Sequence, residues 1–185
     1  MADADALAVA PTLLGATITA NGVTVRITEV EAYLGEVDAA SHAWRGPTPR
    51  TASMFGPPRH LYVYRSHGIH LCANVVCSPA GEASAVLLRA GEVVDGIDAA
   101  RVRRDGSSDR DLARGPARLC RALGIDLSAN GAAPTLVAGE SPVDISTGPR
   151  VGLRHAADRP WRLWITGDPT VSVYRPAAPR RRAGR

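Results

Sequence analysis

Residues 22–34 predict one long β-strand, and this segment constrains the fold more than any other part of the chain. Apolar side chains between residues 23 and 27 alternate with polar ones, as in a strand with one face buried. If the alternation continues, the next members of the core-facing row are Glu29, Glu31 and Tyr33. Two carboxylates at the end of such a row need partners or a chemical task, because buried charges are costly unless paired.

A β-hairpin is predicted over residues 61–77, from two alternating runs at 61–65 and 69–77. The runs are joined by a tight polar turn that ends in Gly68 and carries His67 at its tip. Two of the four tyrosines of the chain, Tyr62 and Tyr64, share one face of the first strand. Tyrosine is common in strands, so Tyr62 is interpreted as a strand residue without a further role.

The remaining elements predict an α+β fold, mostly β with interspersed helices. A helix over 116–123 is the best marked, because Gly115-Pro116 opens it and Gly124 follows it. The others are helices at 6–14 and 92–104, strands at 84–90, 142–154 and 161–174, a long loop at 35–60 and a weakly structured stretch at 128–142. We expect one domain over residues 1–175 and a basic, disordered tail over 176–185.

Composition excludes several classes of protein. Hydrophobic residues make up 45 % of the chain and charged residues 22 %, which is ordinary for a globular protein. There is no run of 18 apolar residues, so no membrane-spanning helix is expected, and the acidic start does not resemble a secretory signal. Three cysteines without disulfide-like spacing suit a reducing compartment, which predicts a cytoplasmic protein.

The basic residues favour a polyanionic partner. The net charge is +4, and all 22 basic residues are arginine. Biased genome composition is the main explanation for the missing lysine, but its chemical consequence remains: no lysine can form a Schiff base. Arginine also makes two-pronged contacts with phosphate.

A zinc site is the weaker interpretation of the hairpin. His67, His70, Cys72 and Cys77 are potential ligands, but they contain no closely spaced cysteine pair. A strand would also place His70 and Cys72 on one face while His67 lies in the turn. We therefore predict no metal.

Six blocks of the sequence resemble the alkyladenine (3-methyladenine) DNA glycosylase family, in its single-domain form found in mammals and bacteria. The blocks run in order from about residue 10 to residue 175, which is nearly the whole chain. They are ITEVEAYLGEVDAASH, TPRTASMFG, LYVYRSHGIHLCANVV, AVLLRAGE, RGPARLCRALGI and GPRVGLRHAADRPWRLWITG. The resemblance implies a curved, mostly antiparallel sheet with flanking helices and a protruding hairpin.

The resemblance also implies a reaction. Members of this family flip a damaged purine nucleotide out of duplex DNA and hydrolyse its glycosidic bond, a task that requires extrusion from the base stack. Their water-activating glutamate corresponds to Glu31. A carboxylate suits this task because it accepts a proton and stabilises an oxocarbenium-like sugar. Glu29 is interpreted as a structural partner of an arginine or of a backbone amide.

The base pocket follows by the same matching. Tyr33 and Tyr64 correspond to the aromatic walls around the flipped base, and His42 to a histidine that contacts base and backbone. Asn74 matches an asparagine that discriminates against normal guanine, and Arg89 an arginine that lines the pocket. For Asn74 and Arg89 a purely structural role as buried hydrogen-bond anchors is an equal alternative.

The DNA-facing residues are inferred in the same way. Arg50 and Arg118 match positions that contact phosphates, although either could be an ordinary exposed arginine. His67 occupies the hairpin-tip position at which mammalian members carry a tyrosine that wedges into the minor groove. This departure bears on the efficiency of flipping and leaves the chemistry unaffected.

Together these features predict a monofunctional glycosylase that excises alkylated, and in some cases deaminated, purines without lyase activity or any cofactor. The expected partner is double-stranded DNA containing damaged purines, and the expected form is a monomer, free of membranes and associated with the nucleoid. A catalytically inert nucleic-acid-binding module of the same fold is the alternative. The sequence does not rank 3-methyladenine, 7-methylguanine, hypoxanthine and ethenoadenine as substrates.

Overall fold

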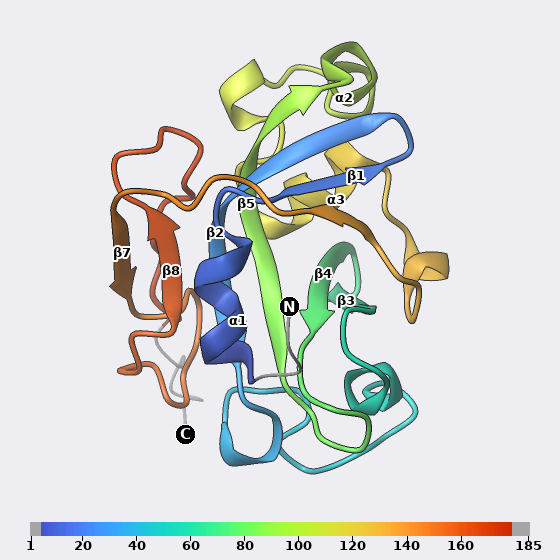
Figure 1. The fold of residues 1–185 in the computed structure, drawn as a ribbon, viewed down its shortest axis with the longest axis vertical. Helices are drawn as coiled ribbons and strands as arrows, with labels where there is room; N and C mark the ends of the chain where they lie inside the picture. The colour runs from blue at the N-terminus through green and yellow to red at the C-terminus, as the bar shows by residue number, and fades with distance from the viewer. Residues whose placement is uncertain (1–4, 179–185) are drawn as a thin grey trace, which may run out of the picture.

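The computed structural model describes residues 5–178, which form an antiparallel sheet of eight strands with three helices around it (Figure 1). The predicted α+β class is therefore confirmed. The strands are β1 (Thr17–Ala20), β2 (Val23–Tyr33), β3 (Leu61–Ser66), β4 (His70–Val76), β5 (Ala85–Asp95), β6 (Thr135–Val137), β7 (Ile145–Gly148) and β8 (Arg162–Ile165). The helices are α1 (Ala6–Leu13), α2 (Ile97–Arg103) and α3 (Pro116–Leu123).

The two longest strands, β2 and β5, pair in the middle of the sheet and organise the rest. The order is β3-β4-β5-β2-β1-β6, and β8 joins β2 as a further neighbour and carries β7 on its other edge. In Figure 1 the β3–β4 hairpin and the β7–β8 pair lie on opposite sides of these central strands. β2 is thus joined to β5, β1 and β8 at once.

A β-bulge in β2 corrects the predicted alternation. Ile27 pairs with Gly91 and Glu29 pairs with Ala90, so Thr28 is an extra residue on β2. A bulge of this kind leaves one residue unpaired and changes which face the following side chains occupy.

Beyond the bulge, Val30 and Ala32 join the buried apolar cluster that already holds the apolar residues of 23–27. Glu29, Glu31 and Tyr33 turn to the opposite face of the sheet. The expectation that they continue the core-facing row was wrong, because the bulge shifts the alternation by one residue.

The helices cover the main core and are marked by local signals. α1 is capped by Asp5, whose side chain accepts hydrogen bonds from the backbone amides of Leu7 and Ala8 at 2.9 and 3.0 Å. α3 begins at Pro116 and is followed by Gly124, which has a φ of 64°, as predicted. α1 packs on β2, and α3 packs on β4 and β5.

The predicted hairpin is confirmed as β3 and β4, with Ser66 paired to His70 across the turn. His67 and Gly68 have φ values of 50° and 75°, and the amide of Ile69 donates to the carbonyl of Ser66. Two consecutive left-handed residues are typical of the turn that matches the twist of a hairpin. The turn holds His67 exposed at the tip.

Several elements differ from the prediction. The helix expected over 92–104 starts only at Ile97, because β5 continues to Asp95 by pairing with the start of β2. The strands expected over 142–154 and 161–174 are reduced to β7 and β8. β1 was not predicted, although Asn21-Gly22 between β1 and β2 is a common hairpin turn.

The long loop 35–60 contains two short 3₁₀ turns, Gly35–Val37 and Ala52–Phe55. Within residues 5–178 no helix has the length and apolar character needed to span a bilayer. The predicted basic tail, 176–185, lies mostly outside the described residues.

Candidate active site

A pocket of about 330 Å³ opens between the end of β2, the β3–β4 hairpin and the segment 151–153. Six of the residues singled out in the sequence line it: Glu31, Tyr33, His42, Tyr64, Asn74 and Arg89. His67 lines it as well, from the hairpin tip. The structure thus brings together side chains from four separate stretches of the chain.

Glu31 is fully buried and is held by three groups. Its Oε1 accepts the backbone amide of Val151 at 2.7 Å and lies 3.3 Å from Nη1 of Arg89. Its Oε2 accepts the Tyr33 hydroxyl at 2.8 Å. Two of these contacts are hydrogen bonds and the third is an ion pair, and together they fix the orientation of the carboxylate.

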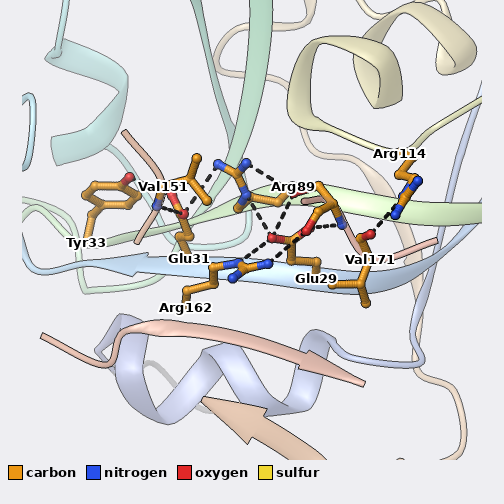
Figure 2. Close-up of polar contacts among 9 residues, drawn as sticks. Glu29, Glu31, Tyr33, Arg89, Arg114, Val151, Arg162 and Val171 are labelled. Atoms are coloured by element: carbon orange, nitrogen blue, oxygen red, sulfur yellow. Dashed lines mark hydrogen bonds and ion pairs between the residues drawn. The ribbon is translucent and has the colours of Figure 1, made fainter. Parts of the chain in front are cut away.

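Arg89 lies between the two carboxylates of β2, as Figure 2 shows. Its Nε donates to Oε1 of Glu29 at 3.0 Å while Nη1 faces Glu31. Burial alone would lower the pKa of the Arg89 guanidinium, but the charges of Glu31 and Glu29 outweigh burial and raise it. Arg89 is therefore a permanent cation at the base of the pocket.

Glu29 is the centre of a second set of contacts that Figure 2 also shows. Its Oε1 accepts a hydrogen bond from Nε of Arg162 on β8 at 2.5 Å, and its Oε2 accepts one from the amide of Ser172 at 2.7 Å. Arg162 in turn donates to the Ser172 carbonyl, and Arg114 donates to the carbonyl of Val171. This pattern agrees with the interpretation of Glu29 as a structural partner.

We refer to Glu29, Glu31, Arg89 and Arg162 as the charge cluster. It contains two carboxylates and two guanidiniums, so its formal charge is zero, and all four residues are buried. The cluster joins β2, β5, β8 and the segment that contains Ser172.

The aromatic walls of the pocket are neutral. Burial and then the Glu31 charge raise the pKa of Tyr33 well above its usual value. Burial also raises the pKa of Tyr64. The ring of His42 meets Tyr64 edge-on with centroids 4.5 Å apart, and its Nδ1 lies 3.1 Å from the Tyr62 hydroxyl. Desolvation at the pocket wall, followed by the Arg50 charge, lowers the pKa of His42 to about 4, so this imidazole is neutral at pH 7.

The other predicted residues take different places. Asn74 is buried and donates to the Tyr62 carbonyl at 3.0 Å, which agrees with a structural anchor and leaves a substrate contact open. Arg50 is exposed beside the pocket, with its guanidinium carbon 5.7 Å from the centre of the Tyr64 ring. Arg118 is exposed in the first turn of α3, away from the pocket lining, 4.0 Å from Asp111.

The potential metal ligands of the hairpin do not converge. Cys72 lines the pocket, whereas Cys77 belongs to the main apolar cluster. In the described part of the chain, no group of three or more histidine, cysteine or acidic side chains could hold a metal ion.

Comparison with known proteins identifies the family of the chain. The sequence model of the methylpurine-DNA glycosylase family matches residues 1–169. The chain belongs to this glycosylase family. The match covers the bulged strand, the hairpin and the segment that donates the Val151 amide to Glu31.

Three relatives of the glycosylase illustrate the similarity. One from Mycobacterium leprae is 53 % identical over 192 residues, covering 95 % of this chain and 88 % of the relative. One from Frankia casuarinae is 50 % identical over 200 residues, covering 97 % and 92 %. One from Cutibacterium acnes is 51 % identical over 183 residues, covering 91 % and 95 %. Each carries the name "Putative 3-methyladenine DNA glycosylase".

Several pocket residues of this glycosylase were missed in the sequence. Tyr62 contributes its hydroxyl to His42, and Cys72 and Val151 line the pocket. The block GPRVGL resembles the family, but nothing in its pattern indicates that the Val151 amide reaches Glu31. Ser172 was likewise missed, because its contact with Glu29 spans 143 positions of the chain.

The charge cluster generates a prediction about stability. Glu29→Gln should lower the free energy of unfolding by about 3–5 kcal/mol, because it leaves buried arginines without their compensating charge. Urea denaturation of the purified variant measures this change.

Glu92→Gln is the matched control, since Glu92 is half-exposed and pairs with Arg26 on the surface. This control should cost less than about 1 kcal/mol. An equally small effect of Glu29→Gln would show that the cluster does not hold the central strands together.

Proposed function

We propose that this glycosylase removes alkylated purines from duplex DNA by hydrolysing the N-glycosidic bond, with Glu31 as the residue that activates water. The observation that carries this proposal is the placement of Glu31. It is a fully buried carboxylate, held by three donors, on the floor of a pocket with aromatic walls. A protein that only bound DNA would gain nothing from a carboxylate in this position.

The reaction needs three events at the sugar. The bond between C1′ and the base nitrogen breaks, and its electron pair leaves with the purine. Water adds to C1′ and gives up a proton, which Glu31 accepts. Before that transfer the carboxylate charge stabilises the positive charge that develops on the sugar. The contacts of Val151, Tyr33 and Arg89 hold the carboxylate still while this happens.

The walls of the pocket favour cationic bases. Tyr33, Tyr64 and neutral His42 offer electron-rich faces, and each well-placed cation–π contact contributes about 0.5–2 kcal/mol. An N-alkylated purine is positively charged and is also the better leaving group. Neutral lesions such as hypoxanthine or ethenoadenine lack both advantages, so they need a proton or hydrogen bond from the protein. Asn74, which lines the pocket, is the residue proposed to discriminate against normal guanine.

The exposed hairpin tip supports base flipping. A purine cannot reach Glu31 while it is stacked in the duplex, so the nucleotide must rotate out of the helix. His67 lies both at the tip and at the pocket edge, where its ring can replace the extruded nucleotide. Arg50 and Arg118 are exposed and suited to hold phosphates on either side. We further propose that the protein acts as a monomer, in the cytoplasm with the nucleoid.

Glu31→Gln should retain binding to a duplex with a methylated adenine and lose base release by roughly 10²–10⁴-fold, the usual value of general-base help. The amide is nearly isosteric but cannot accept the proton. Single-turnover release of free base with excess protein measures the chemical step, and a gel-shift assay measures binding.

Glu82→Gln, the same change at an exposed position, controls for nonspecific effects. It should release base at the parent rate. Release at the parent rate by Glu31→Gln as well would exclude Glu31 as the base.

The enzyme should leave an intact abasic site and should not cut the strand. The chain contains no lysine to form an imine with the opened sugar. Borohydride added during turnover would trap such an imine as a covalent protein–DNA adduct. Denaturing gels should show no adduct, and a trapped band would reveal a lyase step.

His67→Ala should weaken lesion-specific binding and flipping, because the small side chain leaves the vacated space unfilled. His67→Tyr should keep or improve flipping, since the larger ring fills that space better. Fluorescence of a base analogue beside the lesion reports the flipped state directly. Nonspecific binding should change less, because arginine–phosphate contacts supply most of it.

The wedge proposal fails if His67→Ala shows unchanged fluorescence and unchanged affinity for the lesion. In that case His67 would merely suit an exposed turn.

A further inference from the structure

A second buried ion pair lies behind the pocket wall, outside the charge cluster. The side chains of Asp38 and Arg150 are both fully buried, and the two terminal nitrogens of Arg150 meet the two carboxylate oxygens at 2.5 and 2.9 Å. Such a pair need not stabilise the fold, because apolar side chains of similar volume often give the same or a higher free energy of unfolding. Within residues 5–178, Nε of Arg150 also lacks an acceptor. The location of the pair therefore points to another role.

Asp38 shapes the loop that follows β2. Its carboxylate accepts the amide of Leu34 at 3.4 Å and that of Ala40 at 3.1 Å. Burial alone would raise the pKa of Asp38, but the hydrogen bond and charge of Arg150 outweigh burial and lower this pKa, so Asp38 is ionised near neutrality. The loop fixed in this way delivers Ser41 and His42 to the pocket.

Arg150 contacts the pocket wall from behind. Its guanidinium carbon lies 4.5 Å from the centre of the Tyr33 ring and 5.0 Å from that of Trp161. Nη1 also donates to the Ala32 carbonyl at 2.9 Å. These contacts fix the ring whose hydroxyl donates to Glu31.

Arg150 also precedes the residue that touches Glu31 most closely. The amide of Val151 donates to Oε1 of Glu31 at 2.7 Å. Because the two residues are adjacent in the chain, the side-chain anchor of Arg150 sets the position of that amide. Two of the three donors to Glu31, the Val151 amide and the Tyr33 hydroxyl, therefore depend on the same ion pair.

We propose that Asp38 and Arg150 are positioning residues for the glycosylase reaction, which hold the Val151 amide and the Tyr33 hydroxyl against Glu31. This inference rests on the proposed function, in which Glu31 activates water. On this proposal the rate of base release depends on the ion pair, and the affinity for undamaged DNA does not.

The double variant Asp38→Asn/Arg150→Met separates positioning from folding. It removes both charges together, so it avoids the uncompensated charge that either single change would leave. We expect near-parent thermal stability, unchanged affinity for an undamaged duplex, and a single-turnover rate of base release reduced about 10²-fold, the usual effect of a small misplacement.

A split between binding and chemistry provides a readout that a merely structural role would not give. Glu31 is faced by Arg89 from β5, by Tyr33 from β2 and by the Val151 amide. Weakening two of these contacts misplaces the carboxylate but leaves the exposed DNA-facing residues in place. The double variant should therefore bind a duplex with a methylated adenine close to the parent affinity while it releases the base more slowly.

Arg159→Met is the matched control, because Arg159 also stacks on Trp161, at 4.4 Å, but touches neither Asp38 nor Tyr33 in the described part of the chain. It should keep the parent rate of base release and the parent affinity for the lesion duplex. Should the double variant fail to fold, Arg150→Lys retains the charge and loses the planar two-pronged contact. It should still lose at least roughly tenfold in rate.

A stable double variant that keeps the parent rate, or one whose affinity for the lesion duplex falls as far as its rate, would overturn the proposal. A parent rate in Arg150→Lys would overturn it too, if only that variant folds. These outcomes differ from a failure of the proposed function. That failure would appear as no base release by the parent protein, or as parent-rate release by Glu31→Gln.

Discussion

The pairing of Glu29 and Glu31 with two buried arginines is the interaction on which the rest of the structure depends. An isolated carboxylate at either position would be strongly disfavoured, because desolvation of a charge costs far more than one hydrogen bond returns. Arg89 and Arg162 balance the two negative charges within the same buried volume. The cluster therefore allows a carboxylate to sit on the floor of the pocket.

The cluster also explains the arrangement of the strands around it. Arg89 comes from β5, Arg162 from β8, and both meet carboxylates of β2. Residues 171 and 172 are held by hydrogen bonds to the same groups and to Arg114. Glu31 thus stands on a central strand, while the loops at 40–42 and 151–153 and the β3–β4 hairpin supply much of the pocket wall. This arrangement suits a site that must hold one carboxylate precisely and accept different bases.

The bulge at Thr28 turns Glu31 away from the apolar cluster. Without it, Glu31 would face the apolar cluster together with Val25 and Ile27, as simple alternation predicts. With it, Val30 and Ala32 continue the core, and Glu31 and Tyr33 line the pocket on the opposite face. One extra residue in the strand therefore decides which side chains beyond it face the core.

Much of the fold and most of the pocket could be predicted from sequence, because the signals are local or belong to matched blocks. The hairpin, α3 and the pocket residues Glu31, Tyr33 and Tyr64 are examples. The bulge could not be predicted, since it is defined only by the partner strand β5. The ion pair of Asp38 with Arg150 escaped for the same reason, as its members are 112 positions apart. β1 was missed despite a usable signal, the Asn21-Gly22 turn.

The claim that Glu31 presents its negative charge to the reacting sugar is tested most directly by comparing two abasic-site analogues in the same duplex. One carries a pyrrolidine, which is cationic like the sugar in the transition state, and the other a neutral tetrahydrofuran. Two unit charges about 4 Å apart at an effective dielectric constant near 20 attract by about 4 kcal/mol, so the pyrrolidine duplex should bind on the order of 10²-fold tighter or more. Equal dissociation constants for the two duplexes would contradict the account, because the buried carboxylate would then not face the sugar.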